Sequence, residues 1–171
     1  TQARRRETLF LKYIHDYHPL FKDTDTPVWY SREMENSLEG GDELVLNNET
    51  IAIGCSERTS PKAIEVVAAN VFKKGGFKRI LVFDIPKCRA FMHLDTVFTM
   101  VDYDKFTIHP GIEGPLNIYL LTPGKDGVVK SSGQTDTLEH ILKNALSLDS
   151  VDLIRCGGGD PIVSAREQWN D

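Results

Sequence analysis

The feature that most constrains the fold is an order of strand and helix patterns that recurs along the chain. In its first occurrence, residues 43–53 contain the two short β-prone runs and the Asn-Asn-Glu turn of a β-hairpin. Residues 60–76 then predict a helix, with Ser60 as its cap, Pro61 in its first turn and a Gly-Gly pair at its end. The buried face of this helix would comprise Ala63, Ile64, Val67, Ala68, Val71 and Phe72. The apolar run at 80–85 is typical of a buried strand and completes the unit.

The same order returns in outline in the second half of the chain. Strands are predicted at 94–101, 106–109 and 117–121. A capping-box pattern, Asp-Thr-Leu-Glu, opens a predicted helix over 136–146, and a further strand follows at 151–154. The chain therefore contains about two units of strand, strand, helix and strand, with the beginning of a third. We predict an α/β fold.

A separate helix is predicted ahead of these units. After Glu7, apolar residues fall at helical spacing and form one stripe, which Pro19 ends. The stripe comprises Leu9, Phe10, Tyr13, Ile14 and Tyr17. The chain starts at Thr1 without a methionine, and residues 166–171 end without a stop signal. We interpret both ends as cuts inside a longer protein.

The charge balance argues against two classes of partner. The 171 residues carry a formal net charge of −5, and the one basic run is the short Arg4-Arg5-Arg6. Nucleic acids and anionic membranes both need clustered cations. No apolar stretch approaches the roughly 18–20 residues of a membrane span, and no signal-peptide pattern opens the chain. We therefore expect no nucleic acid or membrane partner and a cytoplasmic location.

The cysteines point the same way. Cys55, Cys88 and Cys156 are odd in number, widely spaced and without a Cys-x-x-Cys pair. This pattern disfavours a disulfide framework and a zinc site, and it fits a reducing compartment. We expect all three to be buried, unreactive thiols.

The first candidate site cluster is Glu39-Gly40-Gly41-Asp42, directly before a predicted strand. Glycines let a ligand approach the backbone closely, and carboxylates accept paired hydrogen bonds from a guanidinium. By itself, the same pattern is also typical of a solvated turn.

The second cluster is His93-Leu-Asp95-Thr at the start of the predicted strand 94–101. On a strand, His93 and Asp95 would point to the same face. A histidine beside a carboxylate suits general acid–base catalysis. Metal binding is disfavoured because no third ligand follows at a useful spacing, and a pair on a half-exposed surface is the alternative.

The third cluster is Ser56-Glu-Arg58-Thr59, between a strand and a helix. Loops at strand ends are where ligand-binding groups gather in α/β folds, and Arg58 could bind a carboxylate with two hydrogen bonds. An ordinary surface arginine is the alternative. The Gly157-Gly-Gly-Asp160 segment lacks the lysine of a phosphate-binding loop, which disfavours a nucleotide site.

Taken together, these clusters resemble bacterial arginine deiminases. The resemblance rests on Arg-Glu-Thr near the start and on residues 39–42, 56–59 and 92–96, while 166–171 resembles the stretch before that family's last module. It implies a partial, pentein-like α/β-propeller with about two ββαβ-type modules plus part of a third. The chain would then be a single incomplete catalytic domain over 1–171, with modules near 1–86 and 87–171.

The resemblance also implies an activity. Arginine deiminases hydrolyse L-arginine to L-citrulline and ammonia through a covalent cysteine thiouronium intermediate, with no metal or organic cofactor. His93 matches the general acid–base, and Glu39 matches the carboxylate that orients this histidine and the substrate guanidinium. Asp95 matches an aspartate that binds the guanidinium nitrogens.

Substrate binding is assigned in the same way. Arg58 matches an arginine that binds the substrate α-carboxylate, and either Arg4 or Arg6 matches its partner. Asp42 belongs to the substrate-binding motif, where a structural role is also open. The family often assembles into dimers or larger forms, so a homo-oligomer is expected of the whole protein.

Two parts of the family site have no counterpart here. One is the glycine-rich Arg…Cys-Met segment that carries the nucleophile, and the other is a Phe-Thr-Arg-Asp-type motif that carries a second aspartate. We therefore expect the complete protein to be a deiminase and this chain alone to be inactive. The alternatives are a related guanidino-group hydrolase (dimethylarginine hydrolase, agmatine deiminase or amidinotransferase), a non-catalytic arginine-binding or interaction module, and an α/β domain without a small-molecule site.

Overall fold

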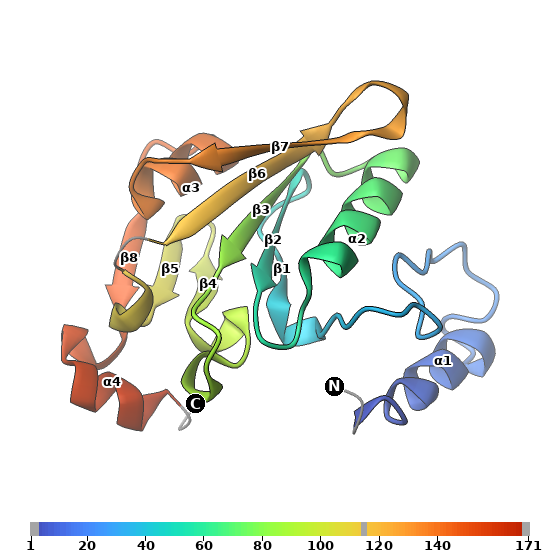
Figure 1. The fold of residues 1–171 in the computed structure, drawn as a ribbon, viewed down its shortest axis with the longest axis horizontal. Coiled ribbons are helices and arrows are strands. Elements are labelled where there is room, and N and C mark those ends of the chain that lie inside the picture. Colours follow the sequence, from blue (N-terminus) through green and yellow to red (C-terminus); the bar gives the residue numbers. More distant parts are fainter. Residues whose placement is uncertain (1–3, 114–115, 169–171) are drawn as a thin grey trace.

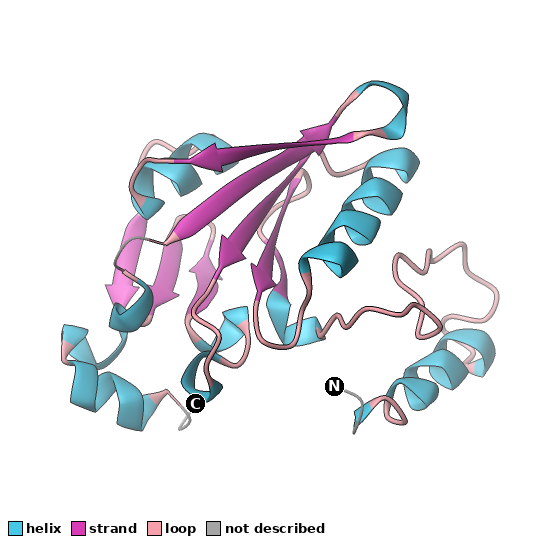
Figure 2. Cartoon of the chain, in the orientation of Figure 1, coloured by secondary structure: helices cyan, strands magenta, loops and turns pink. Residues whose placement is uncertain are grey.

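The structure, a computed structural model, describes residues 4–113 and 116–168 as a mixed α/β arrangement with two sheets (Figures 1 and 2). The helices are α1 (Thr8–Tyr17), α2 (Pro61–Lys74), α3 (Leu138–Leu146) and α4 (Pro161–Glu167). The strands are β1 (Glu43–Val45), β2 (Thr50–Cys55), β3 (Arg79–Asp84), β4 (Phe98–Asp102), β5 (Lys105–Ile108), β6 (Asn117–Pro123), β7 (Val129–Gln134) and β8 (Asp152–Arg155). Among the helices of these residues, none has the length and apolar character needed to cross a membrane.

The predicted order of strand, strand, helix and strand is confirmed in both sheets. In the five-stranded sheet, β1 and β2 pair antiparallel, and α2 leads to β3, which pairs parallel with β2. In the three-stranded sheet, β4 and β5 pair antiparallel, and α3 leads to β8, which pairs parallel with β5. Each unit is thus a hairpin followed by a helical crossover to a parallel strand.

A long hairpin of the second unit joins the sheet of the first. β6 pairs antiparallel with β3, and β7 pairs antiparallel with β6, which gives the strand order β1-β2-β3-β6-β7 (Figure 1). The strand β6 was predicted, but β7 was missed. The sequence of β7, Val-Lys-Ser-Ser-Gly-Gln, is mostly polar and exposed, so its strand conformation comes from pairing with β6 rather than from burial.

Strands β2 and β3 in the middle of the five-stranded sheet are buried on both faces. On one face, Ile51, Ile53, Val82 and their neighbours pack under α2. On the other, Leu81 and Phe83 pack with residues of the second sheet and of α3. These elements lie on that side of the sheet in Figure 1. All six residues of β2 are buried for this reason. The helix face predicted for α2 is confirmed at five positions, and Phe72 is half-buried.

Stacked aromatic rings join the two sheets. The ring of Phe98 in β4 lies 5.0 Å from that of Phe83 in β3 and 5.4 Å from that of Phe106 in β5, measured between ring centroids. All three side chains are fully buried. The rings therefore fix the second sheet against the first through dispersion and burial of large apolar surface.

One predicted helix and one that was missed lie at the ends of the fold. The helix predicted after Glu7 is confirmed as α1, which lies to one side of the sheets (Figure 1). It contains no buried residue: of its apolar stripe, Leu9 is half-buried, and the exposed members are Phe10, Tyr13, Ile14 and Tyr17. A final helix, α4, was missed, although Asp160 and Pro161 carry its start signal: the Asp160 carboxylate accepts hydrogen bonds from the amides of Ile162 and Val163. The cap of α3 is Thr137, one residue later than the predicted capping box.

The strand predicted over 94–101 also begins later than expected. Residues Leu94–Thr96 form a 3-10 turn, η4, and β4 starts only at Phe98. The amide of Leu94 donates to the Asp42 carboxylate, and that of Val97 donates to the Leu94 carbonyl. Because these amides are already bonded, Leu94 and Val97 cannot donate hydrogen bonds to a neighbouring strand.

The expectation of three buried thiols is correct only for Cys55. Cys55 is buried under α2, and burial raises the pKa of its thiol, which keeps it protonated and unreactive. Cys88 is exposed and Cys156 is half-buried, because both lie in turns that follow a strand rather than in a sheet.

One buried histidine makes the stability of the fold depend on pH. His109 is buried at the end of β5; its Nδ1 accepts a hydrogen bond from the Gly111 amide, and its Nε2 has no partner among the described residues. Burial lowers the pKa of His109 below its usual range. The unfolded chain therefore binds this proton more readily than the folded chain does. The free energy of unfolding falls as the pH drops below ~6.5, the ordinary pKa of histidine in an unfolded chain, toward the lower pKa of His109 in the folded state.

We predict that His109→Asn reduces this loss of stability, because the Asn oxygen can accept from the Gly111 amide but cannot be protonated. The measurement is the difference in free energy of unfolding in urea between pH 7 and pH 5. His18→Asn is the matched control: His18 also precedes a proline and accepts an amide hydrogen bond at Nδ1, but it is exposed. An equal pH dependence in His109→Asn and the unsubstituted chain would contradict the prediction.

Candidate functional site

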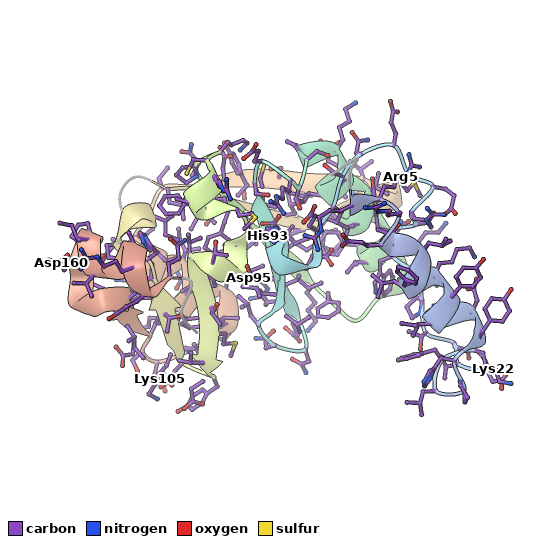
Figure 3. The ribbon with its side chains drawn as sticks, turned by 90° about the horizontal axis from the view of Figure 1, so that it is seen from below. Arg5, Lys22, His93, Asp95, Lys105 and Asp160 are labelled. Atoms are coloured by element: carbon purple, nitrogen blue, oxygen red, sulfur yellow. The ribbon has the colours of Figure 1, made fainter. Side chains whose placement is uncertain are left out.

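The three predicted clusters meet at one edge of the five-stranded sheet. Parallel β2 and β3 end at this edge, so the loop after β2 carries Arg58 there and the segment after β3 carries His93 and Asp95. The antiparallel β1 begins at the same edge, directly after Glu39 and the 3-10 turn η2 (Gly40–Asp42). Figure 3 looks onto this edge from below, with His93 and Asp95 near the middle of the view. Strand pairing thus gathers residues that are far apart in sequence.

Glu39, Arg58 and His93 are in direct contact. The Oε2 atom of Glu39 lies 3.2 Å from His93 Nε2 and 3.5 Å from Arg58 Nη1. Arg58 Nη1 in turn lies 3.3 Å from His93 Nε2. The side chains are mostly covered, with 14% of Glu39, 14% of His93 and 24% of Arg58 exposed. A carboxylate, an imidazole and a guanidinium therefore share one partly desolvated place.

The two contacts of His93 Nε2 require opposite protonation states. Toward Arg58, which can only donate, Nε2 must be an acceptor, as in the neutral imidazole. Toward the Glu39 carboxylate, Nε2 must carry a proton and donate. The same nitrogen therefore has a partner in each state, which is what a group that takes and returns a proton needs.

Asp95 lies beside His93, on the more exposed side of the cluster. Desolvation raises the pKa of its carboxyl, the Asp42 carboxylate acts in the same direction, and the His93 ring opposes both. A carboxylate in this position would gain from a cation placed beside it, because the cation relieves both destabilising effects.

Of the two arginines left open at the start of the chain, Arg4 is the one seen next to the cluster. Its Nη1 lies 3.8 Å from Glu39 Oε2, and its guanidinium also pairs with Glu7 at 2.9 Å. Arg6 is exposed. The Arg4 side chain is itself 54% exposed, so this ion pair contributes little to stability.

The surroundings of Asp42 suit the structural role that was left open for it. It is fully buried, and its two oxygens accept hydrogen bonds from Ser56, Thr59 and the Leu94 amide. Such a carboxylate supports the site from beneath instead of facing a ligand. Ser56 and Thr59, which were quoted in their motif without a role, are its buried partners.

Gly41 makes room for the two side chains of the His93 segment. A Cβ at position 41 would lie 2.3 Å from His93 Nδ1 and 2.8 Å from Asp95 Oδ2. Both distances are too short for any side chain, so the backbone at Gly41 forms part of the wall of the site.

Comparison with known proteins agrees with this arrangement. The family model for arginine deiminase matches residues 1–171. The chain belongs to the arginine deiminase family. Curated arginine deiminases from Bacillus cytotoxicus, Clostridium perfringens and Latilactobacillus sakei are 57%, 53% and 49% identical to it, over 99%, 100% and 99% of this chain. The chain spans 42% of the length of each of these relatives.

Membership of the arginine deiminase family confirms the resemblance that the sequence motifs predicted. The roles of Glu39, Arg58, His93 and Asp95 stay predictions. What the structure adds is that the first three touch and that Asp95 lies next to them.

We predict that Gly41→Ala displaces His93, because the added methyl group overlaps its ring. The free energy of unfolding should fall by about 1–3 kcal/mol, as for other overpacked positions, and the NMR signals of the His93 ring should shift. Gly40→Ala is the matched control, since a Cβ there meets nothing within 4 Å. Similar effects of the two substitutions would show that Gly41 is not a wall of the site.

Proposed function

We propose that the full-length protein is an arginine deiminase, which hydrolyses L-arginine to L-citrulline and ammonia. The observation that carries this proposal is the contact between Glu39, His93 and a guanidinium. Within this chain that guanidinium belongs to Arg58, whose Nη1 lies against both the carboxylate and the imidazole. The same pair can receive the guanidinium of a substrate, which is the same chemical group.

The charges of the site suit a flat cation. Glu39 and Asp95 offer carboxylates at one edge, and a guanidinium stays protonated at any working pH. Moving a substrate cation out of water needs such compensation. With the substrate guanidinium on Glu39 and Asp95, Arg58 is free to bind the substrate α-carboxylate through its own guanidinium. Arg4 is the second candidate for this carboxylate because it lies beside Glu39.

The chemistry follows the roles implied by the family. A cysteine thiolate, supplied by a segment outside this chain, attacks the guanidinium carbon and forms a C–S bond. His93 gives a proton to the departing nitrogen as the C–N bond breaks, and ammonia leaves. Water then loses a proton to His93 and attacks the same carbon. The C–S bond breaks as the new hydroxyl group loses its proton to solvent, which releases citrulline and the thiolate. Glu39 holds the His93 ring through both steps. For this chain alone we expect no turnover.

Three further features belong to the same proposal. The two strand–strand–helix–strand units would be neighbouring modules of an α/β-propeller around the active site. The whole protein would work in the cytoplasm as a dimer or larger homo-oligomer. No metal or organic cofactor is assigned a role in the reaction.

We predict that His93→Ala in the full-length protein lowers kcat for citrulline release by about a hundredfold or more, the usual contribution of a general acid–base. His140→Ala is the matched control, because His140 also pairs with an aspartate, Asp136 at 2.9 Å, but lies on the surface of the second unit. The function is wrong if the unsubstituted full-length protein releases no citrulline from arginine.

A substitution at Arg58 tests whether the substrate carries an α-carboxylate, independently of the acid–base role of His93. Replacing Arg58 by Ala should lower kcat/KM for arginine by about tenfold to a hundredfold, through loss of a charge-assisted hydrogen bond pair. The effect on agmatine, which has no α-carboxylate, should be much smaller. Arg89→Ala is the control, since Arg89 is an exposed arginine of the segment after β3. An equal loss for both substrates would assign Arg58 to guanidinium positioning rather than to carboxylate binding.

A further inference from the structure

We propose that Asp42 is a positioning residue, whose buried carboxylate holds the three segments carrying Glu39, Arg58 and His93 in register for catalysis. The catalytic part of this inference rests on the proposed function. The structural part, that one carboxylate fastens three segments, stands on the contacts alone.

The carboxylate of Asp42 is enclosed by donors from two other segments. Its Oδ2 atom accepts hydrogen bonds from Ser56 Oγ at 2.7 Å and from Thr59 Oγ1 at 2.6 Å. Its Oδ1 atom accepts one from the amide of Leu94 at 2.9 Å. Asp42, Thr59 and Leu94 have no exposed surface, and Ser56 has 4%. Three hydrogen bonds to one buried carboxylate offset much of its desolvation.

Each donor is one step from a residue of the site. Leu94 follows His93 directly in the chain, so its amide fixes the backbone from which the imidazole projects. Ser56 Oγ accepts the amide of Arg58 at 3.0 Å. Thr59 Oγ1 accepts the amide of Glu39 at 3.1 Å. Asp42 therefore reaches the backbone of each of the three contacting site residues through a single group.

Both carboxylate oxygens of Asp42 are needed as acceptors for this arrangement. Ser56 Oγ already accepts two amides, those of Arg58 and Thr59, and Thr59 Oγ1 accepts that of Glu39. Each hydroxyl has one proton left to donate, and both protons go to Oδ2 of Asp42. The side-chain oxygen of an asparagine at 42 could still accept a hydrogen bond from the Leu94 amide. Its NH₂ group would then face the hydroxyls of Ser56 and Thr59, which have no other acceptor among the described residues. Asn has the same shape as Asp but not the same hydrogen-bonding capacity.

Glycine at position 54 supports the same reading. A Cβ there would lie 2.4 Å from Asp42 Oδ1 and 2.9 Å from the Leu94 Cβ. The strand β2 thus leaves a space beside the sheet that the Asp42 carboxylate and the Leu94 segment fill together.

The hydroxyl groups of Ser56 and Thr59 allow the link from Asp42 to Arg58 and the link from Asp42 to Glu39 to be tested separately. Ser56→Ala breaks the link to Arg58, so it should raise KM for arginine with a smaller effect on kcat. Thr59→Val breaks the link to Glu39, so it should lower kcat with a smaller effect on KM, because Glu39 orients His93. If Ser56 and Thr59 only stabilised the fold, the two substitutions would not affect KM and kcat separately.

The experiment compares Asp42→Asn, Ser56→Ala and Thr59→Val in the full-length protein. Asp42→Asn should lower kcat/KM by about a hundredfold, the effect of misplacing reacting groups by about 1 Å, and each hydroxyl variant should show one of the two separated effects. Asp102→Asn is the matched control. Asp102 also accepts a backbone amide, that of Tyr103, but it is exposed at the end of β4 and outside the site, so kcat and KM should stay unchanged.

Amide hydrogen exchange, followed by mass spectrometry on the same full-length variants, tests the fastening without using activity. Asp42→Asn should speed exchange in peptides covering 92–97 and 39–42, while peptides of β2 and β3 stay protected. If the unsubstituted protein lacks deiminase activity, the proposed function fails, and exchange still decides whether Asp42 fastens the segments. If Asp42→Asn does not fold, Ser56→Ala and Thr59→Val carry the test. Unchanged exchange at both segments, or hydroxyl variants that alter kcat and KM to the same extent, would overturn the inference.

Discussion

The parallel pairing of β2 and β3 is the constraint on which the rest of the structure depends. The two strands are paired over six positions and are buried on both faces, under α2 on one side and against the second sheet on the other. Because parallel strands end at the same edge, the segments that follow them must emerge side by side. The antiparallel β1 then brings the Glu39 segment to that edge from the opposite direction. An apolar platform thereby decides where the polar groups of the site meet.

The platform alone does not align these groups. The segment from Ile85 to Val97 leaves β3 and makes no strand pairing before β4 begins at Phe98. Its order comes partly from Ile85, Leu94 and Val97, whose side chains are buried in the apolar core. The rest comes from hydrogen bonds at isolated points, which contribute more in a buried place than on the surface because an unsatisfied polar group there is costly. The fold thus combines a wide apolar support with a small number of buried hydrogen bonds directly beneath the site.

Much of the fold could be predicted because its signals are local. The hairpin of β1 and β2, the capped helix α2 and the apolar strand β3 each carry their pattern within a few residues, and the structure has all of them. The strand β7 could not be found in this way, because its polar sequence gains strand conformation only from its neighbour β6. The 3-10 turn at Leu94 was missed for a related reason: its amide is bonded to Asp42, 52 positions earlier in the chain.

The candidate site was predictable in part. The motifs identified Glu39, Arg58, His93 and Asp95, since carboxylates, arginine and histidine have distinctive chemistry. They did not reveal that Asp42 is buried, or that Ser56 and Thr59 bind it, because Ser and Thr are common in solvated loops. One signal was available: Gly54 interrupts the otherwise apolar run of β2, and a glycine within a strand often marks a close approach of other groups.

The His93 segment is held from two directions, and this bears on how the two units cooperate. From the first unit, the Asp42 carboxylate accepts the Leu94 amide. From the end of the second unit, the side-chain amide of Gln168, just after α4, donates to the Ala90 carbonyl and to the Thr96 carbonyl, the latter at 3.2 Å. Because Ala90 and Thr96 lie on either side of His93, Gln168 closes the segment into a loop. The placement of His93 therefore depends on residues from both units, even though its chemical partners, Glu39 and Arg58, belong to the first unit alone.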